Sequence, residues 1–370
     1  MTEAAETADL GVANPRQIKK FTIKAIEKGR VPFIQSSPGI GKSSIVRDIA
    51  RDYNLQLIDM RLSTAAQEDL TGLPEFYTND AGKRRARFAV FDQYFPLVGD
   101  VPPGDKNGWL LFLDEFNSAS EAVQAAAYKL ILDKMVGLEH LNEAVAIVCA
   151  GNLSTDRAIT TQMSTAMQSR LINLGMKEDY QCWLEDVAIP QEYDHRIIAF
   201  LSQYNSKLMD FRPDHNEKTF CCPRTWEFMN SFIKGEEFRI FKDDHGNVKH
   251  FEMREYLPMY AGTITSGVAI EFVQFCQVVN NIIKVSQILA DPDNCPVPSD
   301  NMIQWATIAA MIDKIDDKTF GPMTVYADRF AINFRILFYR AAFVKKPSLR
   351  RHAAYAKSAL LIGKYLTDAE

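Results

Sequence analysis

A glycine-rich string between an apolar segment and a helical segment constrains this chain more than any other feature. The string is Ser36, Ser37, Pro38, Gly39, Ile40, Gly41, Lys42 and Ser43, followed by Ser44. It matches the phosphate-binding pattern GxxxxGK[ST], except that Ser36 replaces the first glycine. Such a loop points backbone N–H groups at phosphates, which side chains would obstruct. The string therefore predicts an ATP site, with Lys42 at the β- and γ-phosphates and the Ser43 hydroxyl on Mg²⁺.

The segments around this string support the prediction. Val31–Gln35 is short, apolar and partly β-branched, as in a buried parallel strand. Ser43–Tyr53 has helical periodicity, and Leu55–Arg61 alternates like a second strand. A helix is also expected over residues 16–29, closed by Gly29. The order strand, loop, helix, strand is a βαβ unit. The alternative interpretation is a chance glycine-rich turn.

An acidic pair follows the next apolar segment. Trp109–Leu113 predicts a buried strand, and Asp114 and Glu115 come directly after it. Carboxyl ends of strands form the ligand crevice of an open α/β sheet. Asp114 would then hold Mg²⁺, and Glu115 would polarise the attacking water. The alternative is an acidic pair that closes a strand in a solvated turn.

Apolar strands alternate with helices along this half of the chain. A helix is expected over Ser120–Lys134, and another buried strand, Ala144–Ala150, ends before Gly151 and Asn152. This alternation predicts the α/β class, with a parallel sheet covered on both faces. We expect a flexible tail over residues 1–12 and the α/β nucleotide-binding domain over residues 13–176.

A long insert, about residues 63–107, interrupts the α/β pattern. Loops of this length inside a compact domain are usually functional. Phe76 and Tyr77 would either grip a substrate or anchor the insert to its own sheet. The basic residues Lys83, Arg84, Arg85 and Arg87 would either contact nucleic-acid phosphates or form a solvated turn.

The second half is mostly helical by pattern. We expect an all-α lid over residues 177–290, with a small hairpin near residues 238–251, and a helical extension over residues 291–370. Its helices are predicted at Glu192–Asp210, Arg224–Gly235, Gly267–Leu289, Ser299–Ile315 and Ala327–Phe343.

Charge and cysteine content narrow the function classes. The net charge is −5, which argues mildly against a dedicated nucleic-acid-binding protein. The six cysteines include no CxxC pair, so neither a zinc site nor a disulfide framework is expected. No stretch approaches the ~20 apolar residues of a membrane span. A cytoplasmic location is therefore expected.

These motifs together resemble the AAA+ ATPase superfamily, and within it the MoxR-like branch. The loop PGIGKS is similar to the AAA+ form PGxGKT, and LFLDEFNSAS carries the DExN tendency of MoxR-like proteins, with Asn117 as its asparagine. The strand IVCAGN resembles the sensor-1 strand. The resemblance implies that Asn152 holds the nucleophilic water opposite Glu115.

Two arginines take their expected roles from the same resemblance. STAMQSRLINLGM resembles the MoxR-like segment with the arginine finger, which implies that Arg170 reaches the nucleotide of a neighbouring subunit. CPRTWEF resembles the sensor-2 motif, which implies that Arg224 binds the nucleotide from the lid. The alternatives are a surface arginine at Arg170 and an ordinary helix start at Pro223, with Arg224 paired to an acid.

The resemblance spans about residues 15–290 and implies a ring, expected to be hexameric. It also implies an insertion where residues 63–107 lie and a hairpin at Val136–Leu141. Relatives remodel protein complexes, often with a partner that contains a von Willebrand factor A domain. A remodelling motor is therefore the leading hypothesis. A nucleic-acid motor or loader and a nucleotide-gated scaffold stay open.

Overall fold

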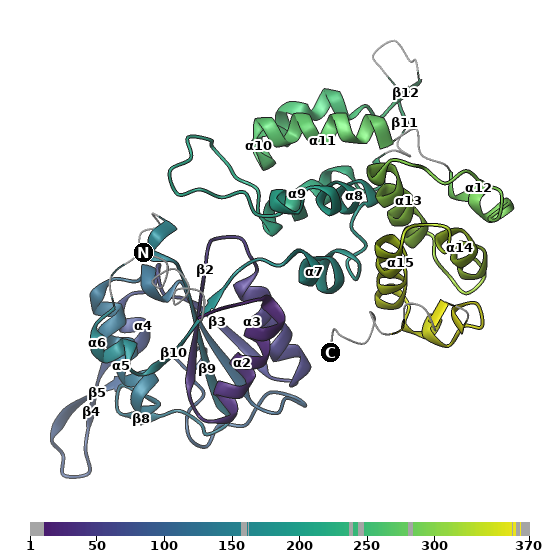
Figure 1. The fold of residues 1–370 in the computed structure, drawn as a ribbon. Coiled ribbons are helices and arrows are strands. Elements are labelled where there is room, and N and C mark those ends of the chain that lie inside the picture. The colour runs from purple at the N-terminus through teal and green to yellow at the C-terminus, as the bar shows by residue number, and fades with distance from the viewer. Residues whose placement is uncertain are drawn as a thin grey trace, which may run out of the picture. The chain divides into compact units, whose positions relative to one another are not determined.

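The structure, a computed structural model, describes residues 11–156, 161, 163–236, 240–242, 248–279, 284–356, 358–359 and 363. It divides the chain into two compact units, Met1–Glu178 and Asp179–Glu370. Each unit is described by itself below (Figure 1).

A six-stranded sheet forms the centre of the first unit, in the order β1-β10-β2-β9-β6-β3. All neighbouring strands in it run parallel. The strands are β1 (Val12–Ala13), β2 (Val31–Ser36), β3 (Gln56–Arg61), β6 (Trp109–Asp114), β9 (Val145–Asn152) and β10 (Leu171–Met176). The helices and 3₁₀ turns are α2 (Pro15–Glu27), α3 (Lys42–Asp52), α4 (Gln67–Thr71), η1 (Phe116–Ser118), α5 (Glu121–Asp133), η2 (Ser154–Asp156) and α6 (Thr165–Gln168).

Successive residues of β6 point to opposite faces of the sheet, and both faces are buried. Leu110 and Phe112 pack in one cluster with α2 and α3. Leu111 and Leu113 pack in the other cluster with α5. A strand covered on both sides reads as a continuous apolar run, which is the pattern of Trp109–Leu113. The predicted α/β class and doubly covered parallel sheet are confirmed.

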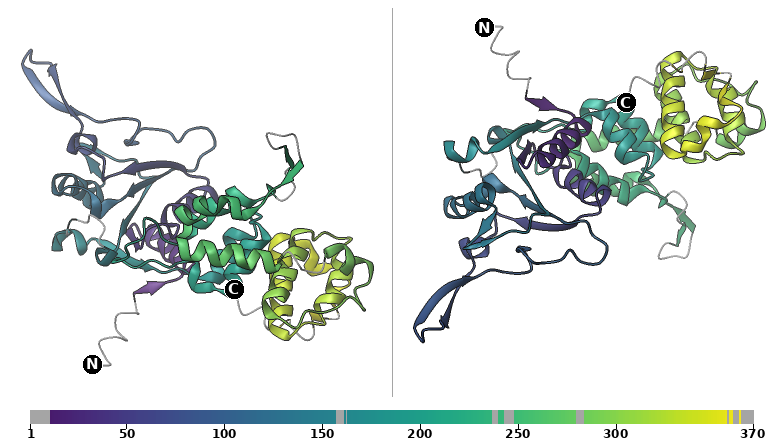
Figure 2. Two further views of the ribbon diagram at one scale, coloured as in Figure 1. Left: turned by 90° about the horizontal axis from the view of Figure 1, so that it is seen from above. Right: turned by 90° about the horizontal axis from the view of Figure 1, so that it is seen from below.

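The insert between β3 and β6 is more structured than the expected loop. It begins with α4 and continues into an antiparallel hairpin of β4 (Leu73–Thr78) and β5 (Arg84–Ala89). Gly72 lies at the base of this hairpin with φ +87, and a Cβ there would lie 2.4 Å from the carbonyl oxygen of Ala89. Figure 2 shows the hairpin extending away from the sheet in both views. A second hairpin, of the two-residue strands β7 (Met135–Val136) and β8 (Glu139–His140), overlaps the predicted segment Val136–Leu141 and begins one residue before it.

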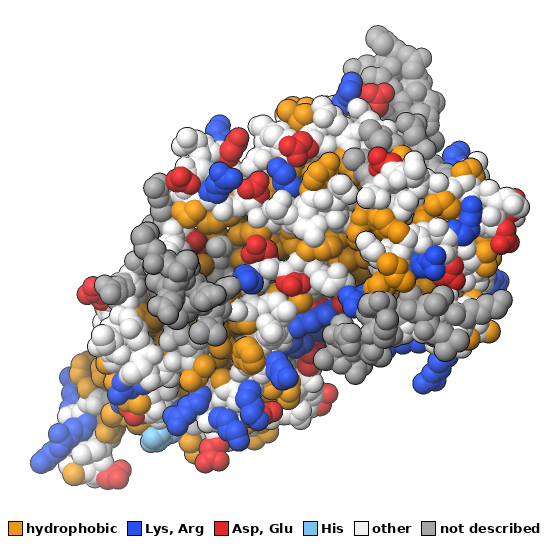
Figure 3. Space-filling view, in the orientation of Figure 1, with side chains coloured by type: hydrophobic (Ala, Val, Ile, Leu, Met, Phe, Trp, Pro, Cys, Tyr) orange, Lys and Arg blue, Asp and Glu red, His pale blue; other side chains and the backbone are white. Residues whose placement is uncertain are grey.

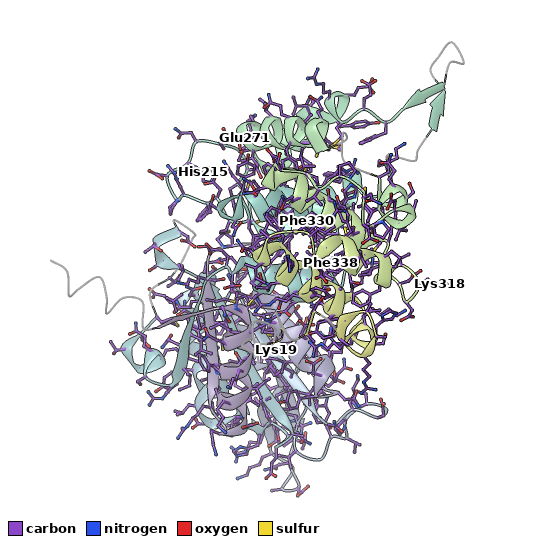
Figure 4. All side chains as sticks on the ribbon, turned by 45° about the vertical axis from the view of Figure 1, so that its right-hand side comes forward. Lys19, His215, Glu271, Lys318, Phe330 and Phe338 are labelled. Carbon is purple, nitrogen blue, oxygen red and sulfur yellow. The ribbon has the colours of Figure 1, made fainter. Side chains whose placement is uncertain are left out.

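The second unit is helical apart from a short hairpin. Its elements are α7 (Tyr180–Trp183), η3 (Leu184–Ala188), α8 (His195–Gln203), η4 (Asn205–Lys207), α9 (Pro223–Ile233), β11 (Ile240–Lys242), β12 (Val248–His250), η6 (Met253–Tyr256), α10 (Leu257–Ile264), α11 (Ser266–Val279), α12 (Val285–Ala290), α13 (Asn301–Asp313), α14 (Phe320–Ala327), α15 (Ile332–Lys345) and η7 (Pro347–Arg351). One hydrophobic core runs from Trp183 to Leu349. Phe330 and Phe338 lie inside it (Figure 4). The lid and extension boundary at residue 290 stays a prediction.

Several predicted helices of this unit were too long. The helix expected over Glu192–Asp210 starts only at His195, because Glu192 has φ 53 and the Asp194 side chain caps α8. The helix expected over Ala327–Phe343 is α15, which starts only at Ile332, because α14 ends at Ala327. The single helix expected over Gly267–Leu289 is α11 and α12, with residues 280–283 outside the described part. The hairpin strands β11 and β12 pair as expected near residues 238–251, while residues 237–239 and 243–247 also lie outside it.

Among the described residues, no helix combines the length and the apolar character that crossing a membrane requires.

Candidate nucleotide-binding site

The glycine-rich string lies where β2 ends and α3 begins. Ser36 is the last residue of β2, so its backbone is extended. A serine adopts this conformation without strain, so the first glycine of the pattern is not needed there. Gly39 and Gly41 have φ values of 80 and 113, which side-chain-bearing residues rarely adopt. A Cβ at Gly41 would meet no atom within 4 Å, so the loop is open there. This loop and the start of α3 together form a candidate cradle for phosphates.

Lys42 folds back across this cradle. Its Nζ donates to the carbonyl oxygens of Ser36 and Ser37, at 2.9 and 3.3 Å. It also donates to the Ser36 hydroxyl at 3.1 Å and to Asn152 Oδ1 at 3.1 Å. The ammonium group thus lies at the carboxyl edge of β2 and β9, where phosphate oxygens can replace these acceptors.

Ser43 and Asp114 meet at the same edge. The Ser43 hydroxyl donates to Asp114 Oδ2 at 3.0 Å, and Glu115 N–H donates to Asp114 Oδ1 at 2.8 Å. A hydroxyl beside a carboxylate is the oxygen-rich donor set that Mg²⁺ prefers. No group of three or more His, Cys, Asp or Glu side chains in the described part of the chain is arranged to hold a metal. These two side chains therefore fit a cation that phosphates and water also coordinate.

Carboxylates gather around this pair of side chains, so the local electrostatic potential is negative. Burial and the charge of Asp114 raise the pKa of Asp59, which lies on the neighbouring strand β3. A bound cation would offset this accumulation of carboxylates.

Glu115 turns away from the sheet with φ 54, in the left-handed region. Non-glycine residues in this conformation are uncommon and cluster at functional sites. Its carboxylate accepts a hydrogen bond from the Ser63 hydroxyl, and Arg61 Nε lies 3.9 Å from its other oxygen. Arg61 is the last residue of β3, the neighbour of β6 in the sheet, and Ser63 follows two residues later. Local sequence did not point to them, because strand order decides which segment lies beside Glu115.

Asn117 connects the turn after Asp114 and Glu115 to β9, the strand that ends with Asn152, through hydrogen bonds. Its side-chain amide donates to the Asn152 carbonyl at 2.7 Å and accepts from the Asn152 N–H at 3.1 Å. The side chain is buried, and its own carbonyl accepts from Thr161 N–H at 2.7 Å. Gly151 leaves room for the amide, because a Cβ there would lie 2.2 Å from Asn117 Oδ1. The position of Asn152 thus depends on Asn117, for which the DExN pattern was the only sequence signal.

Arg170 lies at the opposite edge of the sheet. It directly precedes β10, whose Leu171 pairs with Val31 at the start of β2. Its guanidinium stacks 4.9 Å from the Tyr128 ring centroid and donates to the Ala166 carbonyl at 2.6 Å. The five-residue rise from Val31 to Ser36 is about 16 Å, so Arg170 is far from the cradle of its own chain. Arg224 belongs to the second unit, at the start of α9, and its role at the nucleotide stays a prediction.

Comparison with known proteins agrees with this geometry. Residues 33–172 match the sequence model of the family described as ATPase family associated with various cellular activities (AAA). No curated protein matches the chain.

Two solved structures are similar at low sequence identity. A RuvB point mutant from Thermotoga maritima is 15% identical, with 76% of this chain and 77% of that chain covered and a TM-score of 0.35. A structure described as an ATPase of Cytophaga hutchinsonii is 10% identical, with 98% of this chain and 92% of that chain covered and a TM-score of 0.31. The family match and the parallel sheet show that the α/β unit has the AAA+ ATPase fold.

Proposed function

We propose that this protein is a ring-forming, MoxR-like motor that hydrolyses Mg-ATP to remodel protein complexes. The observation that carries the proposal is a pair of side-chain hydrogen bonds at one edge of the sheet, from Lys42 to Asn152 and from Ser43 to Asp114. These side chains come from two neighbouring strands, β6 and β9, and from α3, the helix that follows β2. Their convergence supports a single triphosphate and metal centre.

Mg-ATP, when bound, supplies the phosphoanhydride bond that is cleaved. Lys42 would compensate charge on the phosphates, and Ser43 and Asp114 would hold the metal. Glu115 would align the attacking water and accept its proton, with Asn152 on the other side of that water. Catalysis of this kind rests on positioning and charge compensation rather than on covalent chemistry of the protein.

The place of Arg170 supports assembly as part of the mechanism. An arginine at the amino edge of the sheet is remote from the cradle in its own chain, yet a neighbouring copy can receive it. An arginine finger given in trans contributes ~10³–10⁵ in rate. Hydrolysis would then depend on a closed ring, for which we propose six subunits. A partner with a von Willebrand factor A domain is part of the same proposal and follows from the MoxR-like motifs alone.

The test separates nucleotide binding from turnover. Lys42→Ala should abolish binding of a fluorescent ATP analogue, while Glu115→Gln should keep the binding and lose phosphate release. Glu121→Gln, an equal charge change on the exposed first turn of α5, is the matched control and should behave as wild type. Normal phosphate release from Glu115→Gln would sink the assignment.

A pull-down identifies what the motor acts on. The Glu115→Gln protein in ATP should retain a protein complex that the Lys42→Ala protein does not. Recovery of the same proteins with both variants would show that ATP plays no part in the capture.

A further inference from the structure

The β4–β5 hairpin is an exposed element of the first unit. Every residue of both strands is exposed, including Phe76 at 65% and Tyr77 at 40%. Basic side chains gather over its end, at the lower left of Figure 3. A two-stranded ribbon this exposed is marginally stable in water, so its exposed aromatics call for a binding role.

The two faces of the hairpin differ in chemistry. Strand alternation and the register Tyr77 to Arg85 and Glu75 to Arg87 place these four side chains on one face. Arg87 pairs with Glu75 at 2.8 Å and lies 5.3 Å over the Tyr77 ring. The other face carries Phe76, with Arg84 at 4.8 Å from its ring centroid, and Phe88. One face is therefore cationic with a tyrosine, and the other is mainly aromatic.

The cations of the first face form a row. Arg85 and Arg87 occupy alternate positions of β5, and Lys83 continues the alternation just before the strand. Alternate residues on a strand are about 6.8 Å apart, twice the 3.4 Å rise per nucleotide of a stacked nucleic-acid strand. Four basic and two acidic residues give residues 73–89 a charge of +2, whereas the whole chain carries −5. The hairpin is thus locally cationic within an acidic chain.

We propose that the β4–β5 hairpin binds single-stranded nucleic acid, with phosphates along Lys83, Arg85 and Arg87 and a base against Tyr77. Regular cation spacing beside an exposed aromatic ring is what a single strand requires, because every base has a face that can stack. An acidic protein segment would need the charges without the ring. Glu75 partly neutralises Arg87, so Lys83 and Arg85 carry most of the phosphate contact. The site would bring the motor to complexes that contain nucleic acid.

The experiment uses the full chain without nucleotide, so its outcome is independent of the ATPase proposal. Fluorescence anisotropy follows a fluorescein-labelled 30-mer of oligo(dT) over a series of salt concentrations. Removing two phosphate contacts with Lys83→Gln and Arg85→Gln should weaken binding about 25-fold at 0.1 M salt and reduce the log–log salt slope by about 1.4. The matched control, Arg212→Gln with Lys218→Gln, removes the same charges from exposed positions of the second unit and should change neither value.

The aromatic contact has its own signature. Tyr77→Ala should weaken binding about 5- to 150-fold and leave the salt slope unchanged, while Tyr77→Phe should restore most of the affinity. Duplex DNA of equal length should bind more weakly than oligo(dT), because its bases are already stacked. Undetectable oligo(dT) binding by the wild type, equal losses in the hairpin and control pairs, or displacement of oligo(dT) by poly-glutamate at equal charge would each overturn the proposal.

Discussion

Replacing Gly151 with alanine should disturb the site through Asn117. A Cβ at position 151 would lie 2.2 Å from Asn117 Oδ1, 2.8 Å from its Cγ and 2.8 Å from Phe33 Cζ. The methyl group must therefore push the amide away from Asn152. Gly151 has no positive φ, so the whole effect is steric.

The magnitude follows from what is lost. Displacing the amide breaks two hydrogen bonds of about 1 kcal/mol each, and overpacking adds about 1–3 kcal/mol. We expect Gly151→Ala to cost about 4 kcal/mol in the free energy of opening of β9. Asn117→Ala alone should cost about 3 kcal/mol, because the Asn152 N–H and C=O lose their partner.

The double variant separates the two causes. An alanine at 117 has no atom in the place of Oδ1 or Cγ, so only the Phe33 contact still opposes a methyl group at 151. The double variant should cost about 5 kcal/mol instead of the additive ~7, which is a coupling of about 2 kcal/mol.

Hydrogen exchange of peptides that cover residues 145–152 measures these opening free energies. Gly262→Ala is the matched control, since a Cβ there meets nothing within 4 Å. It should be neutral or slightly stabilising. Additive costs, or a Gly151→Ala cost below about 1 kcal/mol, would refute the steric reasoning.

Three further results are expected. Arg170→Ala and Lys42→Ala should each lack turnover, yet an equal mixture should regain about a quarter of wild-type phosphate release if neighbours assort randomly in a ring; no recovery contradicts the trans assignment. Ser63→Ala should raise basal turnover about fivefold, because a hydrogen bond of about 1 kcal/mol no longer holds the Glu115 carboxylate; an unchanged or lower rate argues against it. Burial alone would raise the pKa of Asp194, but hydrogen bonds from Arg196 and its charge lower it, so this carboxylate stabilises the fold above pH ~4 and the stabilisation is lost as pH falls further; urea titrations of wild type and Asp194→Asn should therefore converge in acid.

Much of the α/β unit could be predicted from periodicity alone. Buried parallel strands such as Trp109–Leu113 are continuous apolar runs, and their carboxyl ends meet at one edge of the sheet. That rule brought Ser43, Asp114 and Asn152 together in advance, and the structure places them so. The hydrogen bond from Ser63 to Glu115 escaped prediction because it joins residues 52 positions apart through the order of the strands.

Helix ends in the second unit were harder for a physical reason. Phe330 is buried between α14 and α15, so burial continues across the break between the two helices at Asp328–Ala331. Periodicity in the sequence indicates which residues are buried, but it does not indicate where one helix ends and the next begins. The order of the hairpin β4–β5 was also missed, since its strands have no buried face to give an alternation of apolar and polar residues.

The position of Arg170 has a consequence for how copies can be joined. If Arg170 acts in trans, as we propose, each copy receives an arginine at one end of its sheet and gives one from the other end, so contacts between copies would be head to tail. In an open row, the last cradle receives no arginine and the first arginine has no recipient. Under this proposal, only a closed ring supplies every nucleotide site with an arginine. An open oligomer would always contain one nucleotide site that cannot turn over.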